Sequence, residues 1–335
     1  MKLVFFEVEE WEDQQIKDAF SGEEVQLTTE VLNAQTLEKY KDAEVVSTFI
    51  YSRLSKEILS QMPNLKLIAT RSTGFDHIDM AYCHEKNIVV SNVPAYGVHT
   101  VAEHAFALIL ALTKKLLPSV ERTKRGDFSI EGLEGIDLSG KTLGVIGAGK
   151  IGTSVMNIAV GFGMHVLAYT RHPQTSENPN IEYITDLPTL LGRSDIVTLH
   201  LPLSPETKHF INMQNITQFK KGSYLINTAR GGLVETEAIL QGLEQGILAG
   251  AGLDVLENEC DIREERELLS TKFLESCDLK TQLMEHILLD RDDVIITPHN
   301  AFHTIEAVQD ILSTSLKNVK GFLSGSPENV VENNL

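Results

Sequence analysis

A glycine-rich turn is the first feature of this chain whose residue types could do chemistry. Gly147, Gly149 and Gly152 follow an apolar run at residues 143–146 and precede a second run, residues 151–160, that is compatible with a helix. In a strand–turn–helix unit the first glycine makes the tight turn, the second lets backbone N–H groups approach a pyrophosphate, and the third lets the helix pack closely. The turn therefore predicts a dinucleotide-binding site, although a plain strand-to-helix turn can also contain three glycines.

Three charged or titratable side chains follow predicted strands further along the chain: Arg230, Glu259 and His299. Ligands bind at the carboxyl ends of the strands in open α/β sheets. A guanidinium can bind a substrate carboxylate through two hydrogen bonds, a charge-assisted contact worth about 1.5–3 kcal/mol. An imidazole can protonate a carbonyl oxygen while hydride reaches the carbon, and a neighbouring carboxylate favours the imidazolium. The set predicts reduction of a 2-oxo acid, with Arg230 binding the carboxylate, His299 as the acid and Glu259 as its partner.

Each of these side chains also has an ordinary structural explanation. An arginine at a strand end is often a surface ion-pair partner, and a histidine after a proline is often a hydrogen-bonding loop residue. Glu259 lies in an acidic stretch, where solvated carboxylates are common. The joint placement of the three after successive strands favours the catalytic interpretation.

The elements that must position these residues alternate between short β-rich runs and helical runs, which predicts parallel sheets. Thr100 and Glu103 have the spacing of a capping box, which would open a helix over residues 101–117 that Pro118 ends. A charged helical insertion is expected over residues 257–293, and an amphipathic helix over residues 305–323 is expected to return to the first lobe. The expected strands are residues 3–6, 45–50, 67–70, 88–90, 143–146, 165–169, 195–199, 224–227, 249–255 and 294–297.

Composition limits the class of protein. A length of 335 residues predicts two domains with a cleft between them. The apolar content of 42% fits an α/β protein, and no apolar run reaches the ~18–20 residues of a membrane span. The formal charge of −18 disfavours nucleic acid and anionic membranes as partners. Cys83, Cys260 and Cys277 have neither disulfide nor metal-ligand spacing, so we expect no metal site and a reducing, cytoplasmic setting.

Five further segments make the chain recognisable. It resembles the D-isomer-specific 2-hydroxyacid dehydrogenases, and within them the D-lactate dehydrogenase branch, over nearly its whole length. The resemblance implies two doubly wound parallel-sheet domains: a flavodoxin-like substrate domain of residues 1–100 with 299–335, and a Rossmann domain of residues 101–298 that binds NAD(P). It also implies a homodimer. The segments are RSTGFDHID at 71–79, NVPAY at 92–96, VAEH at 101–104, LHLP at 199–202 and NTARG at 227–231.

The family's roles can be carried over to matching positions. Arg230, Glu259 and His299 become the catalytic residues. Backbone N–H groups around Thr73 and Gly74 would help to bind the substrate carboxylate, and Tyr96 and Phe302 would line the substrate pocket. His77, His104 and His200 are interpreted as structural, because the family assigns the proton donor elsewhere. The cofactor-binding positions are Gly147, Gly149, Lys150, Ile151, Gly152, Thr170, Arg171, Leu201, Pro202, Thr207, Thr228, Ala229 and Asp254, the last near the nicotinamide carboxamide.

Two positions depart from the residue pattern of the D-lactate dehydrogenase branch. An acidic residue usually ends the second strand and accepts hydrogen bonds from the adenosine ribose, but here Tyr169 is followed by Thr170 and Arg171. Threonine with arginine could bind a 2′-phosphate, so NADP(H) is favoured over NAD(H). His303 stands where a tyrosine is common, which leaves the selectivity for the substrate side chain open.

These observations together predict an NAD(P)-dependent D-2-hydroxyacid dehydrogenase that acts on a small 2-oxo acid, with pyruvate and D-lactate first. The alternatives are a glyoxylate or hydroxypyruvate reductase, and a non-catalytic, nucleotide-sensing binding module like the corepressor that shares this fold.

Overall fold

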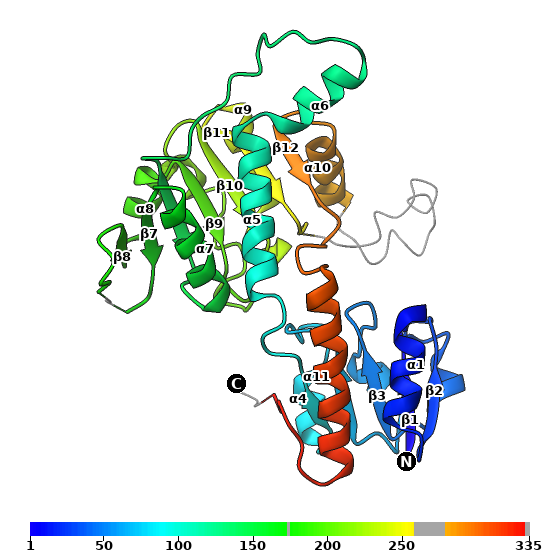
Figure 1. The fold of residues 1–335 in the computed structure, drawn as a ribbon. Coiled ribbons are helices and arrows are strands. Elements are labelled where there is room, and N and C mark those ends of the chain that lie inside the picture. Colours follow the sequence, from blue (N-terminus) through cyan, green and yellow to red (C-terminus); the bar gives the residue numbers. More distant parts are fainter. Residues whose placement is uncertain (173–174, 258–278, 332–335) are drawn as a thin grey trace. The chain divides into compact units, whose positions relative to one another are not determined.

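The computed structural model describes residues 1–172, 175–257 and 279–331, and its chain forms two compact units (Figure 1). The first unit comprises Met1–Tyr96 and His303–Leu335, and the second comprises Gly97–Phe302. The expected boundaries were residues 100/101 and 298/299. Within the described residues no helix is long and apolar enough to cross a membrane.

A five-stranded parallel sheet forms the centre of the first unit, in the order β2-β1-β3-β4-β5. This is the order of flavodoxin-like sheets. α1 and α11 cover one face through Ile16, Leu312 and Val319. Short helices cover the other face. The elements are β1 (Lys2–Phe5), α1 (Glu10–Ala19), β2 (Glu24–Leu27), α2 (Leu37–Tyr40), β3 (Val45–Thr48), α3 (Lys56–Leu59), β4 (Leu67–Thr70), α4 (Met80–Glu85), β5 (Val89–Ser91) and α11 (Ile305–Leu323).

A seven-stranded parallel sheet forms the second unit, in the order β12-β11-β10-β9-β6-β7-β8. The chain order reverses between β6 and β9, as it does in dinucleotide-binding folds. The elements are α5 (Val98–Thr113), α6 (Leu116–Lys124), β6 (Thr142–Ile146), α7 (Lys150–Gly161), β7 (His165–Tyr169), β8 (Ile181–Ile184), α8 (Leu187–Arg193), β9 (Ile196–Leu199), η1 (Ile216–Gln218), β10 (Ser223–Asn227), η2 (Gly231–Leu233), α9 (Thr236–Glu244), β11 (Leu248–Leu253), α10 (Leu279–Leu289) and β12 (Val294–Ile296).

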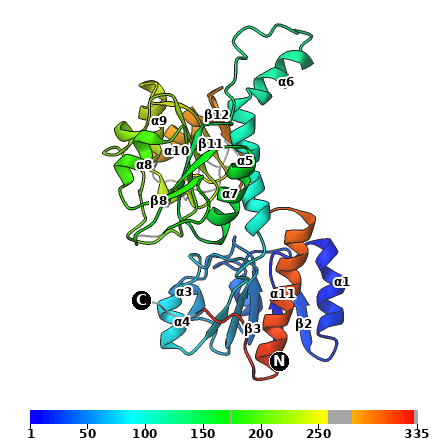
Figure 2. The same cartoon turned by 60° about the vertical axis from the view of Figure 1, so that its left-hand side comes forward.

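Helices cover both faces of this second sheet, with α8 and α9 on one side of the strands and α5 and α7 on the other (Figure 2). α5 and α7 pack on one face through a core that includes Phe106, Ile109 and Val155. α8, α9 and α10 pack on the other face through a core that includes Leu190 and Leu243. The central strands β6, β9 and β10 are therefore buried between layers, which explains why they are recognised in the sequence as short apolar runs.

The helix expected over residues 101–117 is in fact two helices. α5 begins after Gly97, so Thr100 lies inside it and does not cap it. Lys115, at φ 51°, breaks the helix, and α6 follows with Pro118 in its first turn. The capping box and the proline stop were therefore wrong, since a proline is tolerated in the first turn, where its missing N–H has no helical partner.

Two strands were not expected, β2 and β8. Both lie at an edge of their sheet and have one neighbouring strand each. Their side chains are at least partly exposed, so neither forms a buried apolar run. By contrast, β4 and α11 have the bounds expected from the sequence.

Candidate active site

The glycine turn joins β6 to α7. Gly147 has φ +105°, and a Cβ atom there would lie 2.5 Å from the carbonyl oxygen of His200. A Cβ atom at Gly152 would lie 2.0 Å from the carbonyl oxygen of Gly147, so the third glycine lets the helix approach the turn. Gly149 precedes the first turn of α7, and a Cβ atom there would meet nothing within 4 Å. The N-terminus of α7 is thus open to a phosphate, which its backbone N–H groups and dipole favour.

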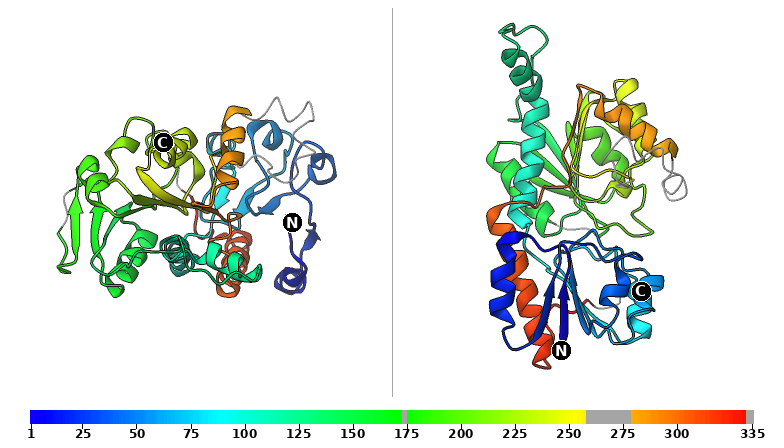
Figure 3. Two further views of the ribbon diagram at one scale, coloured as in Figure 1. Left: turned by 90° about the horizontal axis from the view of Figure 1, so that it is seen from above. Right: turned by 90° about the vertical axis from the view of Figure 1, so that its right-hand side faces the viewer.

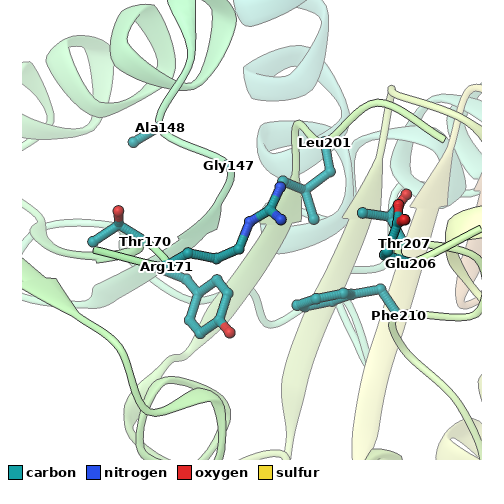
Figure 4. A pocket seen from close by; sticks show the side chains of 9 residues that line it. Gly147, Ala148, Thr170, Arg171, Leu201, Glu206, Thr207 and Phe210 are labelled. Atoms are coloured by element: carbon teal, nitrogen blue, oxygen red, sulfur yellow. The ribbon is translucent and has the colours of Figure 1, made fainter. Parts of the chain in front are cut away.

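A cavity of about 290 Å³ lies beside this turn, and Figure 4 shows its lining side chains. The rings of Tyr169 and Phe210 meet edge to face with centroids 5.7 Å apart. The cavity combines an apolar side with hydroxyl and charged groups, as sites for nucleotides do. Its lining residues are Gly147, Ala148, Tyr169, Thr170, Arg171, Leu201, Glu206, Thr207 and Phe210.

Two opposite charges border this cavity, Arg171 after β7 and Glu206 after β9 (Figure 4). The hydroxyl of Ser204 donates to the Glu206 carboxylate at 2.6 Å. That bond, with a smaller contribution from the positive charge of Arg171, holds the pKa of Glu206 below its ordinary value. Arg171 therefore has an acidic neighbour that a bound phosphate would have to compete with.

Further predicted cofactor positions lie after β9 and β10. Thr207 is buried, and its hydroxyl donates to the carbonyl oxygen of Pro202 at 2.6 Å, which closes the loop after Leu201. Thr228 follows β10, and its buried hydroxyl has no hydrogen-bond partner among the described residues. An orphaned buried hydroxyl costs free energy unless a ligand satisfies it. The open glycine turn, the cavity and this hydroxyl together fit a dinucleotide.

Arg230 lies at the carboxyl end of β10, in a loop tied to its own strand. The Asn227 side chain donates to the carbonyl oxygen of Arg230 at 2.9 Å, and the Arg230 guanidinium donates to the carbonyl oxygen of Ala229 at 2.7 Å. A Cβ atom at Gly231 would lie 1.7 Å from the carbonyl oxygen of Leu256, so this loop abuts the segment that follows β11. Glu259 belongs to that segment but lies outside the described residues.

His299 follows β12, the strand next to β11. It has φ 52°, an uncommon conformation for a non-glycine residue. Its backbone N–H donates to the carbonyl oxygen of Thr297 at 2.9 Å. Asp254, at the end of β11, is buried and accepts hydrogen bonds from the backbone N–H groups of Asn300 and Ala301 at 3.0 and 2.9 Å. The sheet thus places Arg230, Asp254 and His299 after three neighbouring strands.

The first unit carries three of the four predicted substrate residues, Thr73, Gly74 and Tyr96. Three side-chain hydrogen bonds hold the loop after β4. Ser72 donates to the carbonyl oxygen of Gly74 at 2.6 Å, and Thr73 donates to that of Val93 at 2.8 Å. The Asn92 side chain donates to the carbonyl oxygen of Thr73 at 2.8 Å. Tyr96 is half-buried in the same unit. Phe302, also half-buried, belongs to the second unit.

The histidines interpreted as structural have protein partners. Burial lowers the pKa of His200 to about 4, and a ring nitrogen lies 2.9 Å from the hydroxyl of Thr198. His200 is therefore neutral at pH 7 and carries no proton to donate as an imidazolium. His77 lies 3.3 Å from the Thr70 hydroxyl, and His104 lies 3.1 Å from the Thr297 hydroxyl.

Sequence reasoning missed four residues that line the cavity: Ala148, Tyr169, Glu206 and Phe210. Ala148 and Tyr169 are adjacent in the sequence to predicted cofactor-binding residues, and that adjacency is the signal that could have found them. Glu206 and Phe210 lie in the loop after β9 and carry no local signal, because only the pairing of β9 with β6 brings that loop to the glycine turn.

The fold and these strand ends define a dinucleotide-binding oxidoreductase. The family model for the D-isomer specific 2-hydroxyacid dehydrogenase NAD binding domain matches residues 106–301. A D-lactate dehydrogenase from Escherichia coli is 34% identical over 97% of this chain and 98% of its own. A structure of D-lactate dehydrogenase from Aquifex aeolicus, complexed with NAD and lactic acid, is 38% identical, with a TM-score of 0.85 over 97% of this chain and 96% of that one. An acyclic imino acid reductase in complex with NADPH and D-Arg is 25% identical, with a TM-score of 0.82 over 99% of this chain and 100% of that one.

This chain belongs to the D-isomer specific 2-hydroxyacid dehydrogenase family and is an NAD(P)-dependent 2-hydroxyacid dehydrogenase. The two parallel sheets, of five and seven strands, are those of the family's two-domain fold.

Proposed function

We propose that this protein reduces pyruvate to D-lactate. The observation that carries the proposal is the placement of Arg230 and His299 after strands β10 and β12 of a sheet that also carries the open glycine turn. The similarity to D-lactate dehydrogenases supports the choice of substrate. One methylene of pocket size changes preference by only about 1–3 kcal/mol, so glyoxylate and hydroxypyruvate are the competing substrates.

The proposed mechanism assigns one task to each side chain. A bound nicotinamide supplies the hydride. Arg230 binds the substrate carboxylate and polarises the carbonyl, with backbone N–H groups around Thr73 and Gly74 as further donors. His299 carries a proton on a ring nitrogen and donates it to the carbonyl oxygen as the alcohol forms. Glu259 favours the imidazolium form of His299, and Tyr96 and Phe302 line the substrate pocket.

We further propose that the cofactor is NADP(H). Arg171 borders the cavity beside the glycine turn, where a 2′-phosphate would meet its guanidinium, and no carboxylate ends β7. Glu206 opposes this preference, because its negative charge lies close enough to Arg171 to interact with it. The other residues proposed to contact the cofactor are Gly147, Gly149, Lys150, Ile151, Gly152, Thr170, Leu201, Pro202, Thr207, Thr228, Ala229 and Asp254.

The test of function and cofactor is one panel of kcat/KM values for NADPH and NADH with pyruvate, glyoxylate, hydroxypyruvate and phenylpyruvate. We expect pyruvate to be reduced fastest and NADPH to be preferred. Arg171→Ser should lower kcat/KM for NADPH by about 10- to 100-fold, as expected for the loss of a charge-assisted contact, and leave NADH nearly unchanged. Glu206→Gln should move the preference toward NADPH.

Each outcome of that panel has a consequence. A clear preference for NADH in the unmodified protein would remove the NADP proposal. If glyoxylate or hydroxypyruvate were turned over fastest, that compound would replace pyruvate as the proposed substrate. Absence of turnover with every substrate would favour the binding-module alternative.

Glu259→Gln tests the partner of the proposed acid. Loss of the negative charge disfavours the imidazolium of His299, so the alkaline limb of the pH profile for reduction should move to lower pH. The profile is measured as kcat/KM for the 2-oxo acid at saturating cofactor. Asp292→Asn, at an exposed carboxylate just before β12, is the control for the loss of one negative charge. An unchanged profile in Glu259→Gln would remove Glu259 from its role.

We also propose that a second copy of this chain binds an exposed arm formed by α6 and the loop after it, residues 116–131. No residue of α6 is buried, and the arm stands clear of the sheet of its own unit (Figure 3). Phe128 and Ile130 are 80% and 82% exposed. Arg122 donates to the carbonyl oxygens of Ser129 and Glu131 at 2.9 and 2.8 Å, which ties the loop to the helix. An ordered apolar surface of this kind is typical of an interface.

Replacing both Phe128 and Ile130 by serine should convert the dimer to a monomer, because two large apolar side chains leave the interface. Light scattering coupled to size-exclusion chromatography measures the mass. Trp11→Ser, at an exposed apolar residue of the first unit, is the control and should leave the dimer intact. A monomeric unmodified protein, or a dimeric double variant, would contradict the proposal.

A further inference from the structure

The packing of α5 on the sheet brings His104 to the end of β11. A Cβ atom at Gly252 in β11 would lie 3.0 Å from Leu108 and 3.2 Å from Leu112, so this glycine lets α5 lie close to the strand. His104, one turn before Leu108, places its Nε2 atom 3.1 Å from the hydroxyl of Thr297 and 3.5 Å from the Asp254 carboxylate. His104 thus contacts residues at the ends of two strands, β11 and β12.

Asp254 fixes the loop after β12 at three points. Its side chain is fully buried and accepts the Thr297 hydroxyl and the backbone N–H groups of Asn300 and Ala301. His299 lies between these points, with φ 52°. A non-glycine residue keeps such a conformation only where its surroundings determine it. The position of His299 therefore depends on the bonds that Asp254 makes.

The direction of the hydrogen bonds follows from the number of protons. An ionised carboxylate can only accept, and a threonine hydroxyl has one proton to donate. Thr297 gives that proton to Asp254, so its oxygen must accept from His104. His104 must then carry its proton on Nε2.

We propose that His104 is a positioning residue for the reaction. Its Nε2–H holds the Thr297 hydroxyl directed at Asp254, and Asp254 in turn holds the loop that carries His299. The proposal rests on the proposed role of His299 as the proton donor. It assigns His104 a task beyond filling space between α5 and the sheet.

The first test is the tautomer of His104, which does not depend on turnover. Proton–nitrogen correlation spectra of protein labelled on its histidine rings report which ring nitrogen carries the proton, and the His104→Gln variant assigns the signal. We expect Nε2–H in the unmodified protein and a mixture of tautomers in Thr297→Val, which lacks the acceptor. A proton on Nδ1 in the unmodified protein would overturn the proposal.

The second test is kinetic. His104→Leu should lower kcat by about 10- to 100-fold and change KM for the cofactor little, since small displacements of a reacting group cost that much. His104→Gln, whose amide nitrogen can take the place of Nε2, should recover most of the loss. Because His104 and Thr297 act through one bond, the double variant His104→Leu/Thr297→Val should be no slower than the worse single variant.

His165→Leu, at an exposed histidine that begins β7, is the control for the loss of an imidazole. Equal losses in His104→Leu and His104→Gln, or additive losses in the double variant, would show a merely structural role and overturn the proposal. If His299→Ala abolishes turnover while His104→Leu does not affect it, this inference fails alone. If His299→Ala retains turnover, the proposed role of His299 fails.

Discussion

Replacing His299 by alanine is expected to lower kcat for 2-oxo acid reduction by about 10²- to 10⁴-fold, the usual contribution of a general acid. The variant loses the proton that the carbonyl oxygen takes up as the alcohol forms. Steady-state oxidation of NADPH or NADH at saturating pyruvate measures the effect. Cofactor affinity, measured by fluorescence titration, should stay near that of the unmodified protein, because the cavity beside the glycine turn does not include His299.

His84→Ala is the control for that experiment. His84 is an exposed histidine of α4, in the first unit, so its loss removes an imidazole without touching the predicted site. Its kcat should match that of the unmodified protein. A His299→Ala variant that turns over within a few-fold of the unmodified rate would require another proton donor.

Replacing Arg71 by methionine is expected to lower the free energy of unfolding of the first unit by about 3–5 kcal/mol, the cost of breaking a buried ion pair. Arg71 is 2% exposed and donates to the carbonyl oxygens of Phe6 and Glu7 at 2.7 Å each. Its guanidinium lies 3.7 Å from the carboxylate of Glu12, which is also buried. The variant leaves two carbonyl oxygens without their donor and the buried Glu12 carboxylate without its opposite charge.

The single tryptophan, Trp11, makes this measurement specific for the first unit, because it lies in α1. Urea unfolding followed by its fluorescence gives the free energy. Burial raises the pKa of Glu12 and the charge of Arg71 opposes that rise. Adding Glu12→Gln to Arg71→Met should therefore recover part of the loss, since it removes the unpaired buried charge.

Lys66→Met is the matched control, since Lys66 forms an exposed ion pair with Glu44 in the same unit. Solvent screens such pairs, so the unfolding midpoint should hardly move. If Arg71→Met shifted the unfolding midpoint as little as Lys66→Met does, that result would contradict the assigned role of Arg71.

Much of the fold was predictable because its strongest elements carry local signals. β4 and α11 were expected with the bounds they have, since one is a short apolar run and the other a long amphipathic period. The edge strands β2 and β8 were missed because exposed side chains leave no such run. Their backbone pairing with β1 and β7 determines them, and that pairing depends on distant parts of the chain.

The residues of the candidate site likewise divide into those that carry a local sequence signal and those that do not. The glycine turn, Arg230 and His299 were predicted because a residue that follows a strand reveals its place from the local pattern alone. The sequence by itself therefore determined the family and the residues to test, and it predicted the dinucleotide site. Glu206 was not predictable as a neighbour of Arg171, nor His104 as a hydrogen-bond partner of Thr297, because strand order and helix packing bring these pairs together. Only the tertiary structure decided those contacts, since they join residues whose separation along the chain carries no signal of their approach.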